Sequence, residues 1–245
     1  MKVIDIGTLF GVRPATDQDL SSENLLQLMA GNGIAEALTC SLKAIQFSFT
    51  AGNDETLALC QAHPNLHPVA VVDPRQAPDC YGEVARCARL GFVAFRLLRE
   101  YQGWAIANQA HAHVLRAIAG TGLPAIVHVP APGDATALLH LAAELEIPIV
   151  MAAVSYSILS EVLAVMADAP HFALEAHRIC LPGQVELMVE QVGVERLMFG
   201  SWAPLHAQRP SMDMVLGAEI DEPSQAAILG GNARRVFRLG QEEGQ

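Results

Sequence analysis

Short apolar runs alternate with longer segments of helical period along almost the whole chain. The runs are rich in aliphatic residues, and apolar residues recur at helical spacing in segments such as "ENLLQLMAGNG" and "WAIANQAHAHVLRAIAGTG". This alternation is typical of repeated strand–helix units. It predicts eight units, with strands at residues 3–9, 36–41, 69–73, 92–97, 124–129, 147–154, 172–177 and 196–202.

This number of units, in a chain of 245 residues, favours one closed (β/α)8 barrel over a doubly wound sheet. The sequence contains neither a G-x-G-x-x-G nor a G-x-x-x-x-G-K-[ST] phosphate-binding turn, which doubly wound nucleotide-binding domains carry. We therefore expect an α/β fold with a single barrel domain over residues 1–240. Residues 241–245, "QEEGQ", are expected to form a loose tail.

Residues at the expected helix ends agree with this division. Gly33 and Gly193 follow helical runs, where a left-handed residue commonly ends a helix. Asp54 and Asp134 stand where an N-cap is expected.

Composition and charge exclude several classes of protein. The chain is 51% hydrophobic and 17% charged, and its formal net charge is −11, which indicates a well-buried globular protein and argues against a nucleic-acid partner. No apolar stretch reaches the roughly 18 residues of a membrane span, and no leader pattern opens the chain, so we expect a soluble, cytoplasmic protein. The cysteines are scattered without a C-x-x-C pair and are expected to be reduced: Cys40, Cys60, Cys80, Cys87 and Cys180.

Polar side chains gather at the C-terminal ends of the predicted strands, where the active sites of barrel enzymes lie. Strand periodicity places His128 on one face with Ile126, and Arg96 on one face with Ala94. The expected members of this mouth are His128, Arg96, Glu175, His177, Asp73 and Trp202, joined by His206 from the loop after the last strand. Because buried polar groups are costly unless they are paired or wet, their convergence predicts a binding or catalytic site.

Each of these residues also has a structural interpretation. Arg96 can recognise an anion, or it can form an internal ion pair with Asp73 or Glu175. His128 can line a pocket or bond to backbone within the core. Glu175 and His177 can form a catalytic acid–imidazole pair or an inert one.

The chain resembles the amidohydrolase-related TIM-barrel family, which includes hydrolases and decarboxylases of the amino-carboxymuconate-semialdehyde decarboxylase type. The resemblance covers nearly the whole length. It depends on "VIDIGTLFG", "HPVAVVDPR", "LGFVAFRLL", "GLPAIVHV", "GVERLMFGSWAP" and "GGNARRVFRL", which occur in family order with family-like spacing.

The resemblance implies a divalent metal held by an H-x-H pair on strand 1, a histidine on strand 5 and the aspartate of an FGSD motif on strand 8. In this sequence Gly7 and Leu9 occupy the H-x-H positions and Trp202 occupies the aspartate position. His128 alone remains of that ligand set, and one imidazole does not hold zinc. We therefore expect no metal cofactor, with bulk from Trp202 filling the vacated space. A relocated site built from His128, His177 and Glu175 is the alternative.

Three functional hypotheses follow. In the first, a metal-independent hydrolase or lyase acts on a small carboxylate-bearing molecule; Arg96 holds the carboxylate, and His128 or His177 moves a proton with Glu175 orienting the ring. Asp73, Trp202 and His206 would complete the substrate pocket. In the second, the chain is a non-catalytic descendant that binds a ligand or a partner. In the third, it is a metal hydrolase with relocated ligands. Formation of a homodimer is compatible with all three.

Overall fold

The computed structural model describes residues 1–14, 16–179 and 181–240, and within these residues eight parallel strands form one sheet in the order β1 to β8. The strands are β1 (Val3–Phe10), β2 (Ile34–Ser41), β3 (Leu66–Val71), β4 (Ala94–Leu97), β5 (Ala125–His128), β6 (Ile149–Ala152), β7 (Phe172–Glu175) and β8 (Leu197–Met198). Backbone hydrogen bonds join the two ends of the sheet, from Ile6 to Phe199 (3.0 Å) and from Leu9 to Ala203 (2.9 Å). The sheet therefore closes into the predicted (β/α)8 barrel.

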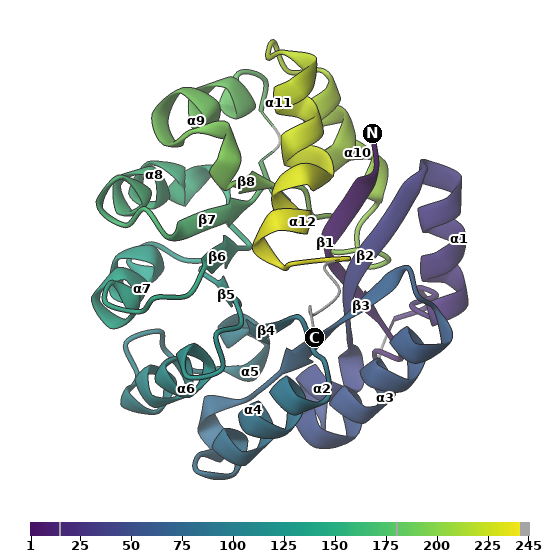
Figure 1. Ribbon diagram of the computed structural model, residues 1–245, viewed down its shortest axis with the longest axis vertical. Helices are drawn as coiled ribbons and strands as arrows, with labels where there is room; N and C mark the ends of the chain where they lie inside the picture. Colours follow the sequence, from purple (N-terminus) through teal and green to yellow (C-terminus); the bar gives the residue numbers. More distant parts are fainter. Residues whose placement is uncertain (15, 180, 241–245) are drawn as a thin grey trace.

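Helices surround the ring of strands (Figure 1). They are α1 (Ser22–Asn32), α2 (Leu42–Gln46), α3 (Phe49–Ala62), α4 (Asp79–Arg89), α5 (Arg99–Gln102), α6 (Gln109–Ala119), α7 (Asp134–Ala142), α8 (Leu159–Asp168), α9 (Gln184–Val192), α10 (Gln208–Leu216), α11 (Glu222–Ala226) and α12 (Asn232–Val236). Short 3₁₀ turns lie at η1 (Pro74–Gln76), η2 (Tyr156–Ile158) and η3 (Val194–Arg196), and a π-helical turn, η4 (Ala227–Gly231), joins α11 to α12. None of the described helices is long and apolar enough to cross a bilayer.

Two apolar layers hold the barrel together. An outer layer packs the strands against the helices, and every strand contributes to it. An inner layer fills the barrel with residues that include Ile6, Leu38, Val71, Ile126 and Met198. Phe237 and Leu239 belong to the same inner cluster, so the segment after α12 closes one end of the barrel. The other end, where the strands reach their C-termini, is left for polar side chains.

The first strand departs from the expected alternation. The sequence predicts that Asp5, Gly7 and Leu9 share the inner face, but Ile4 and Ile6 belong to the inner cluster together with Leu9. The pairing register with β2 shifts between Asp5 and Thr8. Such an irregularity reverses which residues of the strand face inward on its two sides. The prediction was therefore wrong for Asp5, whose carboxylate turns instead to Ser201 and Gln208.

One predicted helix start was also wrong. Asp54 does not cap a helix, because α3 begins at Phe49 with Ser48 as its N-cap. The Ser48 hydroxyl accepts a hydrogen bond from the Ala51 amide. Asp134 is the first residue of α7 rather than its cap, whereas Gly33 ends α1 in the predicted left-handed conformation.

The predicted tail, residues 241–245, and Cys180 lie outside the described residues; the other cysteines are buried and free.

Candidate functional site

A small cavity of about 160 Å³ opens at the C-terminal ends of the strands. Its walls come from strand ends and from the loops that follow β4, β6, β7 and β8. The lining residues are Glu100, Tyr101, His128, Ala153, Glu175, His177, Arg178, Trp202 and His206. This is the position at which (β/α)8 barrels carry their sites, and we call it the mouth cavity.

His128, the last residue of β5, has a defined hydrogen-bonding state. Its Nδ1 lies 2.6 Å from Oε1 of Glu100, and its Nε2 lies 3.4 Å from Nη1 of Arg96. Because a guanidinium group can only donate, Nε2 must accept, which places the imidazole proton on Nδ1. Burial by itself would raise the pKa of the Glu100 carboxyl, but the attraction and hydrogen bond of His128 lower this pKa below its ordinary value.

Arg96 lies beneath the cavity and is 1% exposed. Its Nη2 donates to the Ile6 carbonyl (2.8 Å) and to Oε2 of Glu175 (3.1 Å). Of the two acids that the sequence offered as partners, the structure therefore pairs Arg96 with Glu175. Both side chains of this ion pair are almost fully buried, so removal of either one would leave an uncompensated charge inside the barrel.

Glu175 occupies the space that two glycines leave open. A Cβ atom built on Gly7 or on Gly200 would collide with the Glu175 carboxyl group. The sequence predicted that Trp202 fills the space vacated at Gly7, but the atoms nearest to Gly7 in this direction belong to Glu175. The Arg96–Glu175 pair, and not an indole ring, therefore lies beside the first H-x-H position.

Trp202 forms a wall of the mouth cavity in a strained backbone conformation. Its φ of 62° lies in the left-handed region, which is costly for a bulky residue and which recurs at functional sites. The indole meets the His128 ring edge-on at 5.0 Å between centroids and lies 4.9 Å from the Arg96 guanidinium carbon. Its Nε1 donates to the Tyr101 hydroxyl at 3.1 Å, which leaves the Tyr101 proton free to donate elsewhere.

Three basic side chains line the other side of the mouth cavity. His177 and His206 lie with ring centroids 5.1 Å apart and ring planes tilted by 46°, and Arg178 also lines the wall. Burial first, and then the nearby His206, His128, Arg178 and Arg96 in that order, lower the pKa of His177 to about 3. Burial and then Arg178 also lower the pKa of His206. Within the described residues Nδ1 of His177 is buried and has no hydrogen-bond partner.

The structure brings together most of the residues that the sequence predicted. His128, Glu175, His177, Trp202 and His206 line the mouth cavity, and Arg96 lies directly beneath them. Asp73 is placed differently. It lies two residues beyond the end of β3, accepts hydrogen bonds from Arg75 (2.7 Å from Oδ2 to Arg75 Nη2) and caps η1, and it is not among the lining residues.

Sequence reasoning missed Glu100, Tyr101, Arg178 and Ala153. Glu100 and Tyr101 lie on α5, a helix of four residues that is too short to produce a periodic pattern. Arg178 directly follows the predicted strand 172–177, so counting one residue beyond the strand end would have found it. Ala153, with φ of 60°, gives no signal in the sequence.

Asp5 joins the first and last strands beside this site. The buried carboxylate accepts hydrogen bonds from the amides of Gly7 and Ser201, from the Ser201 hydroxyl and from the Gln208 amide group. Burial raises the pKa of Asp5 to about 7, and these hydrogen bonds oppose the shift only in part. Asp5 thus fixes the backbone on which Gly7 and Trp202 are placed.

The described residues contain no group of three or more His, Cys, Asp or Glu side chains arranged to hold a metal ion. Glu175 is bound to Arg96, and His128 uses its two ring nitrogens for Glu100 and Arg96. The set His128, His177 and Glu175, which the sequence offered as a relocated site, lines the mouth cavity but is not arranged to hold a metal ion in the described part of the chain.

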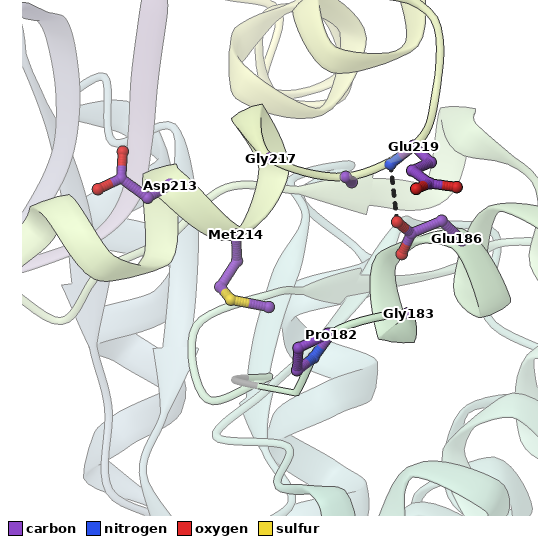
Figure 2. Close-up of a pocket in the computed structure, with 8 residues that line it drawn as sticks. Pro182, Gly183, Glu186, Asp213, Met214, Gly217 and Glu219 are labelled. Atoms are coloured by element: carbon purple, nitrogen blue, oxygen red, sulfur yellow. Dashed lines mark hydrogen bonds between the residues drawn. The ribbon is translucent and has the colours of Figure 1, made fainter.

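A larger groove, of about 670 Å³, runs between α9 and the end of α10 (Figure 2). Two of its three carboxylates already have partners, because Glu186 accepts from the Glu219 amide (2.7 Å) and Asp213 pairs with Arg209 (2.7 Å). The Met214 side chain extends toward Pro182 across the groove (Figure 2). This groove shares no lining residue with the mouth cavity and contains no titratable base.

Fold and site together define a (β/α)8-barrel protein with a small polar cavity at the C-terminal mouth. The chain belongs to the amidohydrolase family, whose sequence profile matches residues 8–239. No curated protein sequence matches the chain.

Solved structures share the fold at low sequence identity. A 2,6-dihydroxybenzoate decarboxylase from Rhizobium is 16% identical, with a TM-score of 0.79 over 98% of this chain and 99% of the other. A dihydroxybenzoic acid decarboxylase from Polaromonas, with manganese and the inhibitor 2-nitroresorcinol bound, is also 16% identical, with a TM-score of 0.79 over 99% and 98% of the two chains. A 5-carboxyvanillate decarboxylase from Sphingomonas paucimobilis is 16% identical, with a TM-score of 0.75 over 97% and 99%.

Proposed function

We propose that this protein is a metal-independent enzyme of hydrolase or lyase type that acts on a small carboxylate-bearing molecule in the mouth cavity. The observation that carries this proposal is the ring of basic groups around His177. The charged neighbours that lower the pKa of His177 most are all basic, namely His206, His128, Arg178 and Arg96, in a chain whose formal net charge is −11. Arg178 in the same wall takes part in no ion pair among the described residues, and an unneutralised cation in a cavity favours an anionic ligand.

The pairing of the two acids in the cavity strengthens this argument. Glu175 is neutralised by Arg96, and Glu100 is bound to His128. Within the described residues, Arg178, His177 and His206 take part in no ion pair. These three groups are therefore the ones that can receive the carboxylate, in place of Arg96, which Glu175 already engages.

In this proposal the residues at the cavity have different roles in binding and in proton transfer. Arg178 binds the carboxylate as a permanently charged donor, and His206 and His177 donate to it once they take up a proton. His128 transfers the proton of the reaction at Nε2. Trp202 and Tyr101 form the wall against the rest of the ligand, and the Tyr101 hydroxyl can donate a hydrogen bond to it. The volume of about 160 Å³ limits the occupant to a small molecule.

Metal independence is inferred from the chemistry of the donor set. A divalent ion at the family position needs several lone pairs aimed at one point. Gly7, Leu9 and Trp202 offer no ligand atom there, and the Nε2 lone pair of His128 faces the Arg96 guanidinium at 3.4 Å. A fixed cation within hydrogen-bonding distance of the remaining ligand does not fit a second, divalent cation beside it.

The alternative function is that of a non-catalytic ligand-binding barrel. The burial of the Arg96–Glu175 pair favours this alternative, because an internal ion pair is satisfied without any substrate. Under both functions Arg178 binds the carboxylate, but only the enzyme needs the proton transfer at His128.

Turnover and binding of a panel of small aromatic and aliphatic carboxylates separate the two functions. For the enzyme we expect turnover of at least one compound, loss of turnover in His128→Ala, and loss of binding in Arg178→Ala. The exposed Arg209→Ala, which removes an equal charge on α10, serves as the control and should change neither. Binding without turnover across the panel would favour the non-catalytic barrel, and an unchanged rate in His128→Ala would remove this histidine from the mechanism.

A further inference from the structure

The short helix α5 places a carboxylate against His128 that no sequence pattern indicated. Glu100 is the second residue of α5, and its Oε1 lies 2.6 Å from Nδ1 of His128. The His128 side chain is 4% exposed and that of Glu100 is 27% exposed, so the pair is largely shielded from water. A hydrogen bond to an ionised acceptor in such surroundings is roughly twice as strong as a neutral one.

The helix itself is fixed at every residue around Glu100. Arg99 pairs with Asp134 on α7 at 2.7 Å, Tyr101 accepts from Trp202, and Gln102 donates to the Val72 carbonyl at 3.2 Å. These contacts join α5 to three separate parts of the barrel. Glu100 is therefore presented to His128 from a rigid support, which is what orientation of a reacting group requires.

The other ring nitrogen of His128, Nε2, is also held in place, by Arg96. Arg96 donates toward Nε2 at 3.4 Å, so that nitrogen carries the lone pair while Nδ1 carries the proton, and this long contact breaks when Nε2 takes up a proton. Rotation of the ring by half a turn about Cβ–Cγ would exchange Nδ1 with Cδ2 and Nε2 with Cε1, so that carbon atoms would face the Glu100 carboxylate and the guanidinium. The two neighbours thus permit one ring orientation and one tautomer.

We propose that Glu100 is the positioning residue of the site: it fixes His128 in the orientation and tautomer needed for proton transfer at Nε2. This inference rests on the proposed function, in which His128 moves the proton. When Nε2 accepts a proton from the substrate or from water, the imidazole becomes cationic and the Glu100 carboxylate balances that charge. Glu175 continues to neutralise Arg96, so each of the two cations, Arg96 and protonated His128, has its own carboxylate partner.

This role differs from the one that the sequence assigned. Glu175 was expected to orient an imidazole, but its carboxylate is bound to Arg96 and has no hydrogen bond to either ring in the described residues. Glu100 takes the orienting role from a different element. His177 has no such orienting acid, because its buried Nδ1 has no hydrogen-bond partner in the described part of the chain.

The test compares Glu100→Gln with wild type by proton NMR of protein labelled with ¹⁵N-histidine. We expect a far-downfield proton attached to Nδ1 of His128 in the wild type, identified by its loss in His128→Ala. In Glu100→Gln this signal should move upfield or broaden away, because a neutral amide replaces the carboxylate. Glu144→Gln, an equal change of charge at an exposed position beyond α7, should leave the signal unchanged. A wild-type spectrum without such a proton, or a signal that survives Glu100→Gln unchanged, overturns the proposal.

Kinetics on any compound that the panel identifies provide the second readout. Glu100→Gln should lower kcat about tenfold or more with little change in KM, because the carboxylate acts on the proton transfer and does not touch the substrate carboxylate. An unchanged kcat, with the NMR signal lost, overturns the positioning role. Absence of turnover in the wild type contradicts the proposed enzyme and not the geometry of the pair, which the NMR signal tests separately.

Discussion

At the scale of single residues, the centre of the mouth depends on two glycines. Gly7 and Gly200 leave the space that the Glu175 carboxyl group occupies, and Glu175 in turn holds Arg96. The sequence identified Gly7 as a departure from the family pattern, but it could not show which side chain would enter the space. That outcome depends on contacts between β1, β7 and β8, which are far apart in the chain.

Gly7→Ala should destabilise the protein. The added Cβ collides with the buried Glu175 carboxyl group, and such overpacking costs about 1–3 kcal/mol in the free energy of unfolding. The matched control is Gly31→Ala, at a helical glycine of α1 with open space around it, which should raise the free energy of unfolding by about 0.5 kcal/mol. Urea denaturation of both variants checks this, and equal stability of Gly7→Ala and wild type would contradict the close contact.

Asp5 should make the stability of the wild type depend on pH. Its pKa is about 7 in the folded protein and about 3.9 in an unfolded chain, so between these values the folded state holds a proton that the unfolded state has released. The Asp5 contribution to the free energy of unfolding therefore falls as pH rises from about 4 to about 7, and it is constant above that range.

The difference in unfolding free energy between wild type and Asp5→Asn isolates this contribution. Urea denaturation at about pH 4.5, 6 and 8 should show the wild type losing stability relative to Asp5→Asn from the first value to the last. A difference that does not change with pH would show that the four hydrogen bonds keep Asp5 ionised throughout.

At the scale of elements, the sequence predicted every strand of the described barrel and the end of α1 at Gly33. It succeeded because strands buried on both faces read as short apolar runs between helical segments. It failed at α5, which has only four residues, and at the start of α3, which is set by the N-cap Ser48. Elements of this size have too few positions for a periodic signal, and α5 is the element that carries Glu100 and Tyr101.

Asp134→Asn should loosen α5. The change weakens the bond between Arg99 and α7, a charge-assisted contact worth roughly 1.5 kcal/mol, so amide exchange across residues 98–104 should accelerate about tenfold. Hydrogen exchange followed by mass spectrometry measures this effect. Asp54→Asn, which removes an exposed acid that pairs with Arg86, is the control and should leave that segment unchanged. Unchanged exchange in Asp134→Asn would mean that packing alone holds α5.

At the scale of the whole molecule, the barrel gathers basic groups at one end of an acidic protein. The sequence identified His128, His177 and His206 there, but it could not pair Arg96 with Glu175 in preference to Asp73. That choice depends on three-dimensional geometry, because Asp73 binds Arg75 within its own turn. Arg178 was missed because it lies just beyond a predicted strand end, and Glu100 because it lies on the four-residue α5.

Binding of a carboxylate should be linked to proton uptake. The pKa of His177 is about 3 in the free protein and that of His206 is also lowered; a bound anion raises both, so the complex holds more protons than the free protein. The affinity for benzoate, used as a probe, should therefore increase as pH falls from about 7 to about 5. Calorimetry in buffers with different ionisation enthalpies measures the uptake, and His206→Gln should reduce it. Affinity that does not change with pH would contradict a carboxylate seated between these rings.

Titration of manganese into chelator-treated protein, followed by calorimetry, tests the central claim most directly. Manganese is the ion bound in the Polaromonas relative, and we propose that the residues at the mouth of this barrel do not fit such an ion. The account predicts no saturable binding at the mouth, and the same weak heats in wild type and His128→Ala. Stoichiometric binding of manganese that is lost in His128→Ala would contradict it.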